Sequence, residues 1–211
     1  MECLKLFQEI LSPDRLSASY VVVNRETGDT RPVTVEDSHK RLSSINLNDN
    51  VPEDIRSYFE TIKNVFLYGW FVYAFYTVAM FLSFTVIEMA SREKFKQDDP
   101  DREWNFPKLI HVAKKRGFIT EEGFVSVKRG RERFGKTFEE ATTPIDQPIE
   151  DYCAILAKSI PSLRNVFAHP ERDMIVLPSD AISTMVLAAE FINQLFPAKS
   201  LDIAKSKDQC F

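Results

Sequence analysis

The feature that most constrains the fold is an uncharged apolar stretch from Asn64 to Ile87, which lies between Lys63 and Glu88. A run of about 18 or more apolar residues is long enough to cross a bilayer as one helix. The same run also suits a long helix that is buried on all sides in a helical domain. The choice between these two interpretations decides how the rest of the chain folds.

The residues around this stretch favour the buried helix. A helical pattern precedes it at residues 54–59, and residues 88–96 continue it without a turn. A membrane span more often has interfacial anchors at both ends and a basic bias on one side. We therefore expect a central core helix in a cytoplasmic protein with no membrane attachment, and excess apolar surface that a second copy covers. The alternative is a membrane-anchored protein with one span at 64–87.

Composition sets broad limits. The chain has 211 residues, 44% of them hydrophobic, and a net charge of −4, which gives no overall reason to expect nucleic acid. Its three cysteines, Cys3, Cys153 and Cys210, lie far apart and form no metal-type pair, so reduced thiols are expected. We expect no metal site and no cofactor.

The N-terminal part predicts small elements and then long helices. Residues 2–11 predict a short helix, and β-branched runs at 19–23 and 31–35 around a glycine turn predict a hairpin. From Pro52 to about Lys96 no proline interrupts the chain, which predicts one or two long helices.

The second half predicts further helices. They cover 107–116 with Gly117 as the C-terminal cap, a short turn from 120, 149–159, a restart near Pro161 that ends by Pro170, and 178–196. The fold class is mainly α: a helical bundle with a small N-terminal β-hairpin. We divide the chain into an N-terminal elaboration (1–51), a bundle (52–197) with a basic insertion at about 97–148, and a tail (198–211).

The insertion concentrates positive charge. Between Lys108 and Lys136 there are nine basic and three acidic residues, a balance of +6 (9 − 3), so the remainder carries −10 (−4 − 6). A solvated loop explains this, and so does a phosphate-contacting patch that binds RNA. The candidate RNA-binding residues are Lys128, Arg129, Arg131, Arg133 and Lys136.

The segment from Ser162 to Pro170 contains the strongest candidates for catalytic residues. Asn165 and His169 lie four residues apart, so on a helix the amide can hold the imidazole in one tautomer. Arg164 lies about 140° around the helix from His169, and two copies around a twofold axis would bring them together more easily. The alternative for His169 is a capping residue at a helix C-terminus.

These residues resemble the R-x4-6-H motif of HEPN domains, in which the residue after the arginine is often Asn. The resemblance extends to residues 88–92, to 109–117 and to the closing helix 178–196, and covers roughly residues 52–196 in helix order. It implies a HEPN-like helical bundle, commonly dimeric, with the motifs near the interface.

The resemblance also implies an activity: metal-independent cleavage of RNA, in toxin–antitoxin, phage-defence or RNA-processing systems. His169 would move protons and Arg164 would stabilise phosphoryl charge, giving a 2′,3′-cyclic phosphate and a 5′-OH. Asn165 and Glu88 complete the candidate site. Glu88 would orient Arg164 or His169, or it pairs with Arg92 at i+4 as an ordinary helix carboxylate. An antitoxin or regulatory protein is a possible partner. The alternative is a non-catalytic HEPN-like module that binds RNA, a nucleotide or a protein.

Overall fold

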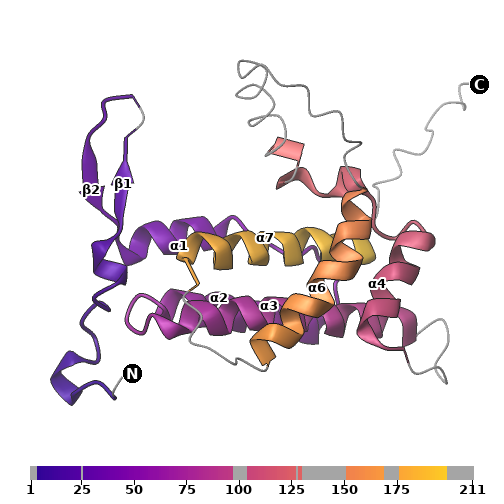
Figure 1. Ribbon diagram of the computed structural model, residues 1–211, viewed down its shortest axis with the longest axis horizontal. Coiled ribbons are helices and arrows are strands. Elements are labelled where there is room, and N and C mark those ends of the chain that lie inside the picture. Colours follow the sequence, from indigo (N-terminus) through magenta and orange to yellow (C-terminus); the bar gives the residue numbers. More distant parts are fainter. Residues whose placement is uncertain are drawn as a thin grey trace, which may run out of the picture.

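The computed structural model describes residues 4–24, 26–96, 104–126, 128–129, 151–168 and 176–198. In these ranges the chain is mainly helical, with one two-stranded antiparallel sheet (Figure 1). The α-helices are α1 (Val35–Ser43), α2 (Glu53–Tyr68), α3 (Ala74–Lys96), α4 (Phe106–Lys115), α6 (Tyr152–Ala168) and α7 (Pro178–Leu195). The strands are β1 (Val21–Val23) and β2 (Thr30–Pro32), and three short 3₁₀ helices cover Phe7–Glu9, Ser17–Ser19 and Glu121–Gly123.

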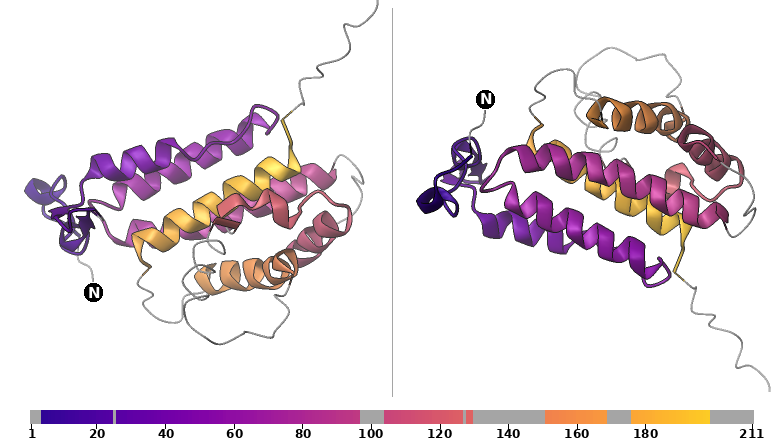
Figure 2. Two further views of the ribbon diagram at one scale, coloured as in Figure 1. Left: turned by 90° about the horizontal axis from the view of Figure 1, so that it is seen from above. Right: turned by 90° about the horizontal axis from the view of Figure 1, so that it is seen from below.

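The helices form three layers. Figure 2 shows α3 and α7 side by side in the middle, α1 and α2 along one side, and α4 and α6 along the other. α3 packs against α2, α4, α6 and α7, so it is the central helix of the bundle. Its largest fully buried side chains include Phe84, Ile87 and Phe95. The prediction of a mainly α fold with a small hairpin is confirmed.

The predicted hairpin forms but is followed by a helix that the pattern missed. Val22 pairs with Arg31, and Gly28 adopts a φ of 77° in the turn. The second strand ends at Pro32, so the predicted extent to Val35 is wrong. Thr34 instead caps α1 in a capping box with Asp37, in which each side chain bonds the other residue's backbone N–H.

The apolar stretch does not form one helix. It is divided by a turn at residues 69–73 between α2 and α3. Of the one or two long helices predicted from Pro52 to about Lys96, the chain therefore forms two, and the interpretation of the stretch as a single helix is wrong. An N-terminal segment holds this turn: Asp14 N–H donates to the Trp70 carbonyl over 2.8 Å, and Ser17 Oγ donates to the Gly69 carbonyl over 3.1 Å. These contacts satisfy carbonyls that a continuous helix would have bonded internally.

One described helix, α3, is long and apolar enough to cross a membrane by length and composition alone. In its most apolar window 44% of the residues are buried inside the bundle. Its buried polar side chains, Ser83 and Ser91, donate to carbonyls one turn earlier in the helix, Ala79 and Ile87 respectively.

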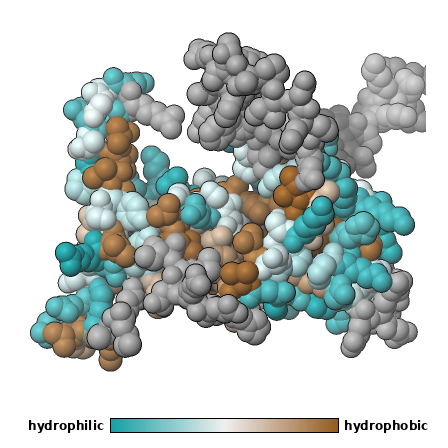
Figure 3. All heavy atoms as spheres, viewed as in Figure 1, coloured by the Kyte–Doolittle hydropathy of each residue, from teal (hydrophilic) through white to brown (hydrophobic). Residues whose placement is uncertain are grey.

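The predicted N-terminal helix is also wrong for the residues described. Residues 7–9 make a single 3₁₀ turn in which no residue is buried. Leu4, Phe7 and Leu11 are all well exposed, and Figure 3 shows hydrophobic surface on this N-terminal segment. An isolated helix this short gains too little from its own hydrogen bonds to offset the cost of nucleation, and here no core burial supports it.

α6 continues through the proline at which a break was predicted. The helix runs unbroken from Tyr152 to Ala168 with Pro161 inside it. Pro161 removes one backbone hydrogen bond, but Pro161 and Ile160 are both buried against the bundle. Burial on this face accounts for the continuous helix.

Three predictions in the second half are confirmed. α4 covers Phe106–Lys115, and Gly117 follows it with a φ of 69°, the left-handed conformation typical of a C-terminal cap. The short turn after Thr120 is the 3₁₀ helix Glu121–Gly123, and α7 occupies Pro178–Leu195.

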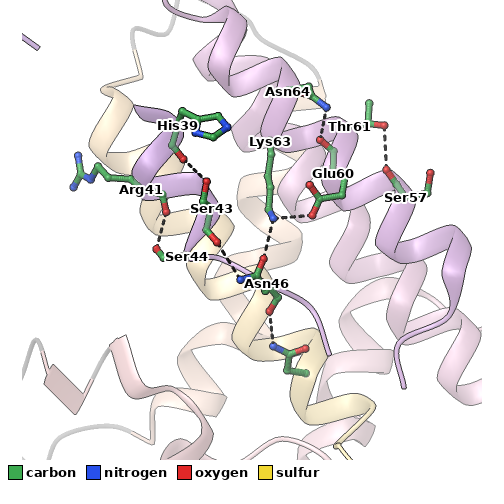
Figure 4. Close-up of polar contacts among 11 residues, drawn as sticks. His39, Arg41, Ser43, Ser44, Asn46, Ser57, Glu60, Thr61, Lys63 and Asn64 are labelled. Atoms are coloured by element: carbon green, nitrogen blue, oxygen red, sulfur yellow. Dashed lines mark hydrogen bonds and ion pairs between the residues drawn. The ribbon is translucent and has the colours of Figure 1, made fainter. Parts of the chain in front are cut away.

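The segment from α1 to α2 joins the main core. Leu42, Ile45 and Val51 are buried in the same apolar cluster as the long helices. The buried Lys63 on α2 donates to Glu60 over 2.7 Å and to Asn46 over 3.4 Å, which fixes the loop after α1 against α2 (Figure 4). Residues 35–51 therefore pack as part of the bundle.

Candidate functional site

The contact between α3 and α6 positions the candidate site. Phe84 of α3 and Phe167 of α6 stack with ring centroids 6.1 Å apart and an interplanar angle of 25°. Glu88 lies one turn after Phe84, and Arg164 lies one turn before Phe167, so both lie near this contact. The apolar pair therefore fixes the spacing at which the two charged side chains meet.

Glu88 binds two arginines, one through each carboxylate oxygen. Its Oε2 lies 3.3 Å from Arg164 Nη2, and its Oε1 accepts from Arg92 Nη2 over 2.7 Å and from Arg92 Nε over 3.1 Å. Arg92 Nη1 also donates to the Trp104 carbonyl over 2.9 Å. Both roles considered for Glu88, orienting Arg164 and pairing with Arg92, thus occur together.

Arg164 is held but remains accessible. Its side chain is 34% exposed, whereas that of Glu88 is 14% exposed. Its Nη1 donates to Asn165 Oδ1 over 3.3 Å, and its Nε is buried without a hydrogen-bond partner among the described residues. Both 3.3 Å contacts are long for charge-assisted bonds, so each is weaker than a close ion pair.

The structure describes part of the predicted site. Glu88, Arg164 and Asn165 come together as above. Lys128 and Arg129 are exposed, and the segment before them is held on α7, where Ser126 donates to Glu190 through its N–H and its hydroxyl over 2.9 and 2.6 Å. Outside the described residues lie His169, Arg131, Arg133 and Lys136.

The apolar side chains of the motif helix are only partly buried. Phe167 is buried, but Leu163 and Val166 are 38% and 45% exposed, and Ile155 is 38% exposed. α6 turns its other side, with Cys153, Leu156 and Ile160, toward the bundle. The motif helix therefore carries an outward stripe of apolar side chains, Ile155, Leu163 and Val166, which we call the α6 stripe.

No metal-type cluster of three His, Cys, Asp or Glu occurs in the part of the chain that the structure describes. Cys153 is a buried free thiol, and burial raises its pKa to about 11. It is protonated at neutral pH, so it is a poor nucleophile there.

The sequence indicates Arg92 only as an i, i+4 partner of Glu88. In the structure, Arg92 binds the Glu88 carboxylate through two nitrogens and also donates to the Trp104 carbonyl. The i, i+4 spacing predicts the first contact but not the second, because residue 104 lies on a different segment.

Comparison with protein-family models, with curated proteins and with solved structures finds no match to this chain.

Proposed function

We propose that this chain is a HEPN-type, metal-independent endoribonuclease that cleaves RNA by attack of a 2′-OH on the adjacent phosphate. The observation that supports the proposal is the pairing of Glu88 on α3 with Arg164 on α6, which presents a one-third-exposed guanidinium at the α3–α6 contact. An arginine held in this way is suited to bind phosphoryl oxygens.

The proposed reaction needs one cation and one proton carrier. The 2′-oxygen attacks phosphorus, the bond from phosphorus to the 5′-oxygen breaks, and the 5′-oxygen takes a proton. His169 would accept the 2′-OH proton or protonate the leaving oxygen, and Arg164 would stabilise charge on the phosphoryl oxygens. The products are a 2′,3′-cyclic phosphate and a 5′-OH end. Glu88 and Asn165 would limit the orientations that Arg164 adopts.

RNA would be held by basic side chains outside this centre. Lys128 and Arg129 are exposed and contribute to the phosphate-contacting patch proposed for the insertion, together with the predicted Arg131, Arg133 and Lys136. We further propose a homodimer through the α6 stripe, because it would bring two copies of the motif helix together. A cellular role as a toxin or defence effector, restrained by a partner protein, belongs to the same proposal.

One observation favours a second function. The terminal nitrogens of Arg164 already contact Glu88 and Asn165, as they would in a structural ion pair. A non-catalytic HEPN-like module that binds RNA, a nucleotide or a protein partner would need no more than this.

RNA cleavage in the presence of EDTA separates the two functions. We expect the wild-type protein to cut RNA, and we expect Arg164→Ala and His169→Ala to abolish cutting while the helical circular-dichroism signal stays unchanged. The matched controls are Arg15→Ala and His39→Ala, at exposed positions away from the site, which should cut normally. Cutting that persists in both site variants, or that requires a metal ion, contradicts the proposal. RNA binding without cutting supports the second function.

A further inference from the structure

The hairpin, α1, the turn between α2 and α3 and the beginning of α7 lie at the same end of the bundle (Figure 1). Residues of these elements line a cavity. Its volume is about 490 Å³, within the range of small-molecule sites in proteins. It is remote in the fold from Glu88 and Arg164, which lie at the α3–α6 contact, and none of its lining residues belongs to that site. We call it the hairpin pocket.

The wall of the hairpin pocket is mainly aromatic. Phe66 and Tyr76 meet edge to face with centroids 4.8 Å apart, and Trp70 and Ile182 complete this wall. Phe66 and Tyr76 are almost fully buried, so the accessible apolar surface of the pocket comes from other lining residues, such as the half-buried Trp70 and the exposed Val21. The Trp70 indole favours a flat apolar body, because an aromatic side chain has little rotamer entropy to lose on binding.

The part of the pocket lining that α1 contributes carries positive charge. Lys40 and Arg41 of α1 line the pocket, are exposed, and have no acidic partner within the described ranges. In Figure 4 the Arg41 side chain extends away from the polar contacts between α1 and α2. Both residues also lie in the last turn of α1, where cations stabilise a helix C-terminus, but that role does not require them to line a cavity.

The acidic side chain at the pocket is already neutralised. Asp37 lines it, and Arg31 binds both oxygens of Asp37 over 2.7 Å each. The charge left for a ligand is therefore that of Lys40 and Arg41.

We propose that the hairpin pocket binds a small molecule that has a flat apolar body and an anionic group. The body lies against Trp70 and Val21, the accessible apolar side chains of the lining, and the anion faces Lys40 and Arg41. Apolar burial supplies affinity, and the two cations select for the charge.

Two dyes test this proposal. The anionic probe is 8-anilino-1-naphthalenesulfonate, and the neutral probe is N-phenyl-1-naphthylamine, which lacks the sulfonate. Titration followed by dye fluorescence should show saturable binding of both at one site. We expect Lys40→Glu/Arg41→Glu to weaken the anionic dye at least about fivefold and the neutral dye less than twofold, because only the sulfonate meets the reversed charges.

A second variant tests the location. Ser38→Trp, at a half-buried α1 position on the pocket wall, should weaken both dyes because the indole occupies the cavity. Ser179→Trp, at a lining position on α7, replaces Ser38→Trp if that variant loses its helical circular-dichroism signal. Lys115→Glu/Lys158→Glu, with the same change in net charge at exposed positions on α4 and α6, should change neither affinity.

Two outcomes overturn the proposal. Unchanged affinity of both dyes in the tryptophan variants means that they bind elsewhere, for example on the exposed apolar side chains of the N-terminal segment. Equal loss of the neutral and anionic dyes in Lys40→Glu/Arg41→Glu means that charge does not select the ligand.

Discussion

Glu88 on α3 contacts Arg164 on α6 through Oε2 and Nη2, which are 3.3 Å apart, while its other oxygen binds Arg92 of its own helix. One partly buried carboxylate therefore connects two helices and forms ion pairs with two guanidinium groups. Because a single negative charge faces two positive charges, the cluster keeps a net charge of +1 that an anion can neutralise. This relationship makes the α3–α6 contact a candidate site as well as a packing interface.

The first prediction concerns the strength of this pair. In a double-mutant cycle, Glu88→Gln and Arg164→Met should show a coupling of about 0.2–1 kcal/mol in the free energy of unfolding, since Arg164 is one-third exposed and solvent screens the interaction. Urea unfolding of the four proteins measures it. If the proposed function holds, Glu88→Gln also lowers the rate of RNA cleavage. A coupling of zero would show that the two side chains act independently.

The second prediction concerns the turn that divides the apolar stretch. A Cβ at residue 69 would lie 2.6 Å from Tyr76 Cε1 and 2.8 Å from the Phe66 carbonyl oxygen. Gly69→Ala should therefore destabilise the fold by about 1–3 kcal/mol, the usual cost of overpacking. The same substitution in a Tyr76→Leu background should cost less, because the ring that it meets is gone. Equal costs in both backgrounds would show that the ring is not the obstacle.

The third prediction concerns alkaline pH. Burial raises the pKa of the Cys153 thiol to about 11, from an ordinary value of 9.0. A raised pKa contributes stability that is complete below the unfolded pKa and is lost as the pH rises through the folded one. Wild-type stability should therefore fall between about pH 9 and pH 11. Cys153→Ala should lose less stability across that interval, as measured by urea unfolding at each pH; an identical loss would exclude the thiol as a cause.

The fourth prediction concerns the α6 stripe. If two copies associate through Ile155, Leu163 and Val166, then Val166→Glu places a charge in the interface and should convert the dimer to a monomer. Light scattering after size exclusion gives the mass. Val78→Glu is the matched control, because Val78 on α3 is 41% exposed and should leave the dimer intact. A wild-type monomer at micromolar concentration would contradict the dimer proposal.

Local sequence signals predicted much of the fold. The glycine turn between β-branched runs forms the hairpin, Gly117 ends α4, and Pro178 begins α7. Such signals act between residues a few positions apart, so they can be recognised without knowledge of the fold. The capping box of Thr34 and Asp37 was also available as a signal and would have predicted α1.

The Arg164–Asn165 segment was likewise found from sequence, and so was the possibility that Glu88 orients it. The pairing distance, the exposed fraction of Arg164 and the link from Arg92 to the Trp104 carbonyl depend on how α3, α4 and α6 pack. Neither spacing nor propensity contains that information.

The uncharged stretch from Asn64 to Ile87 shows most clearly what the sequence determines and what the tertiary structure determines. Its composition, together with the helical patterns on both sides, by itself indicated that helical structure would form there. Only the tertiary structure decided that it forms two helices, because the turn at Gly69 and Trp70 is held by Asp14 and Ser17 from a distant part of the chain. Likewise, α6 continues through Pro161 because tertiary burial on that face offsets one lost hydrogen bond. Composition and local patterns determine which segments are apolar enough to be buried. Contacts between distant segments determine where each helix ends and which elements it packs against.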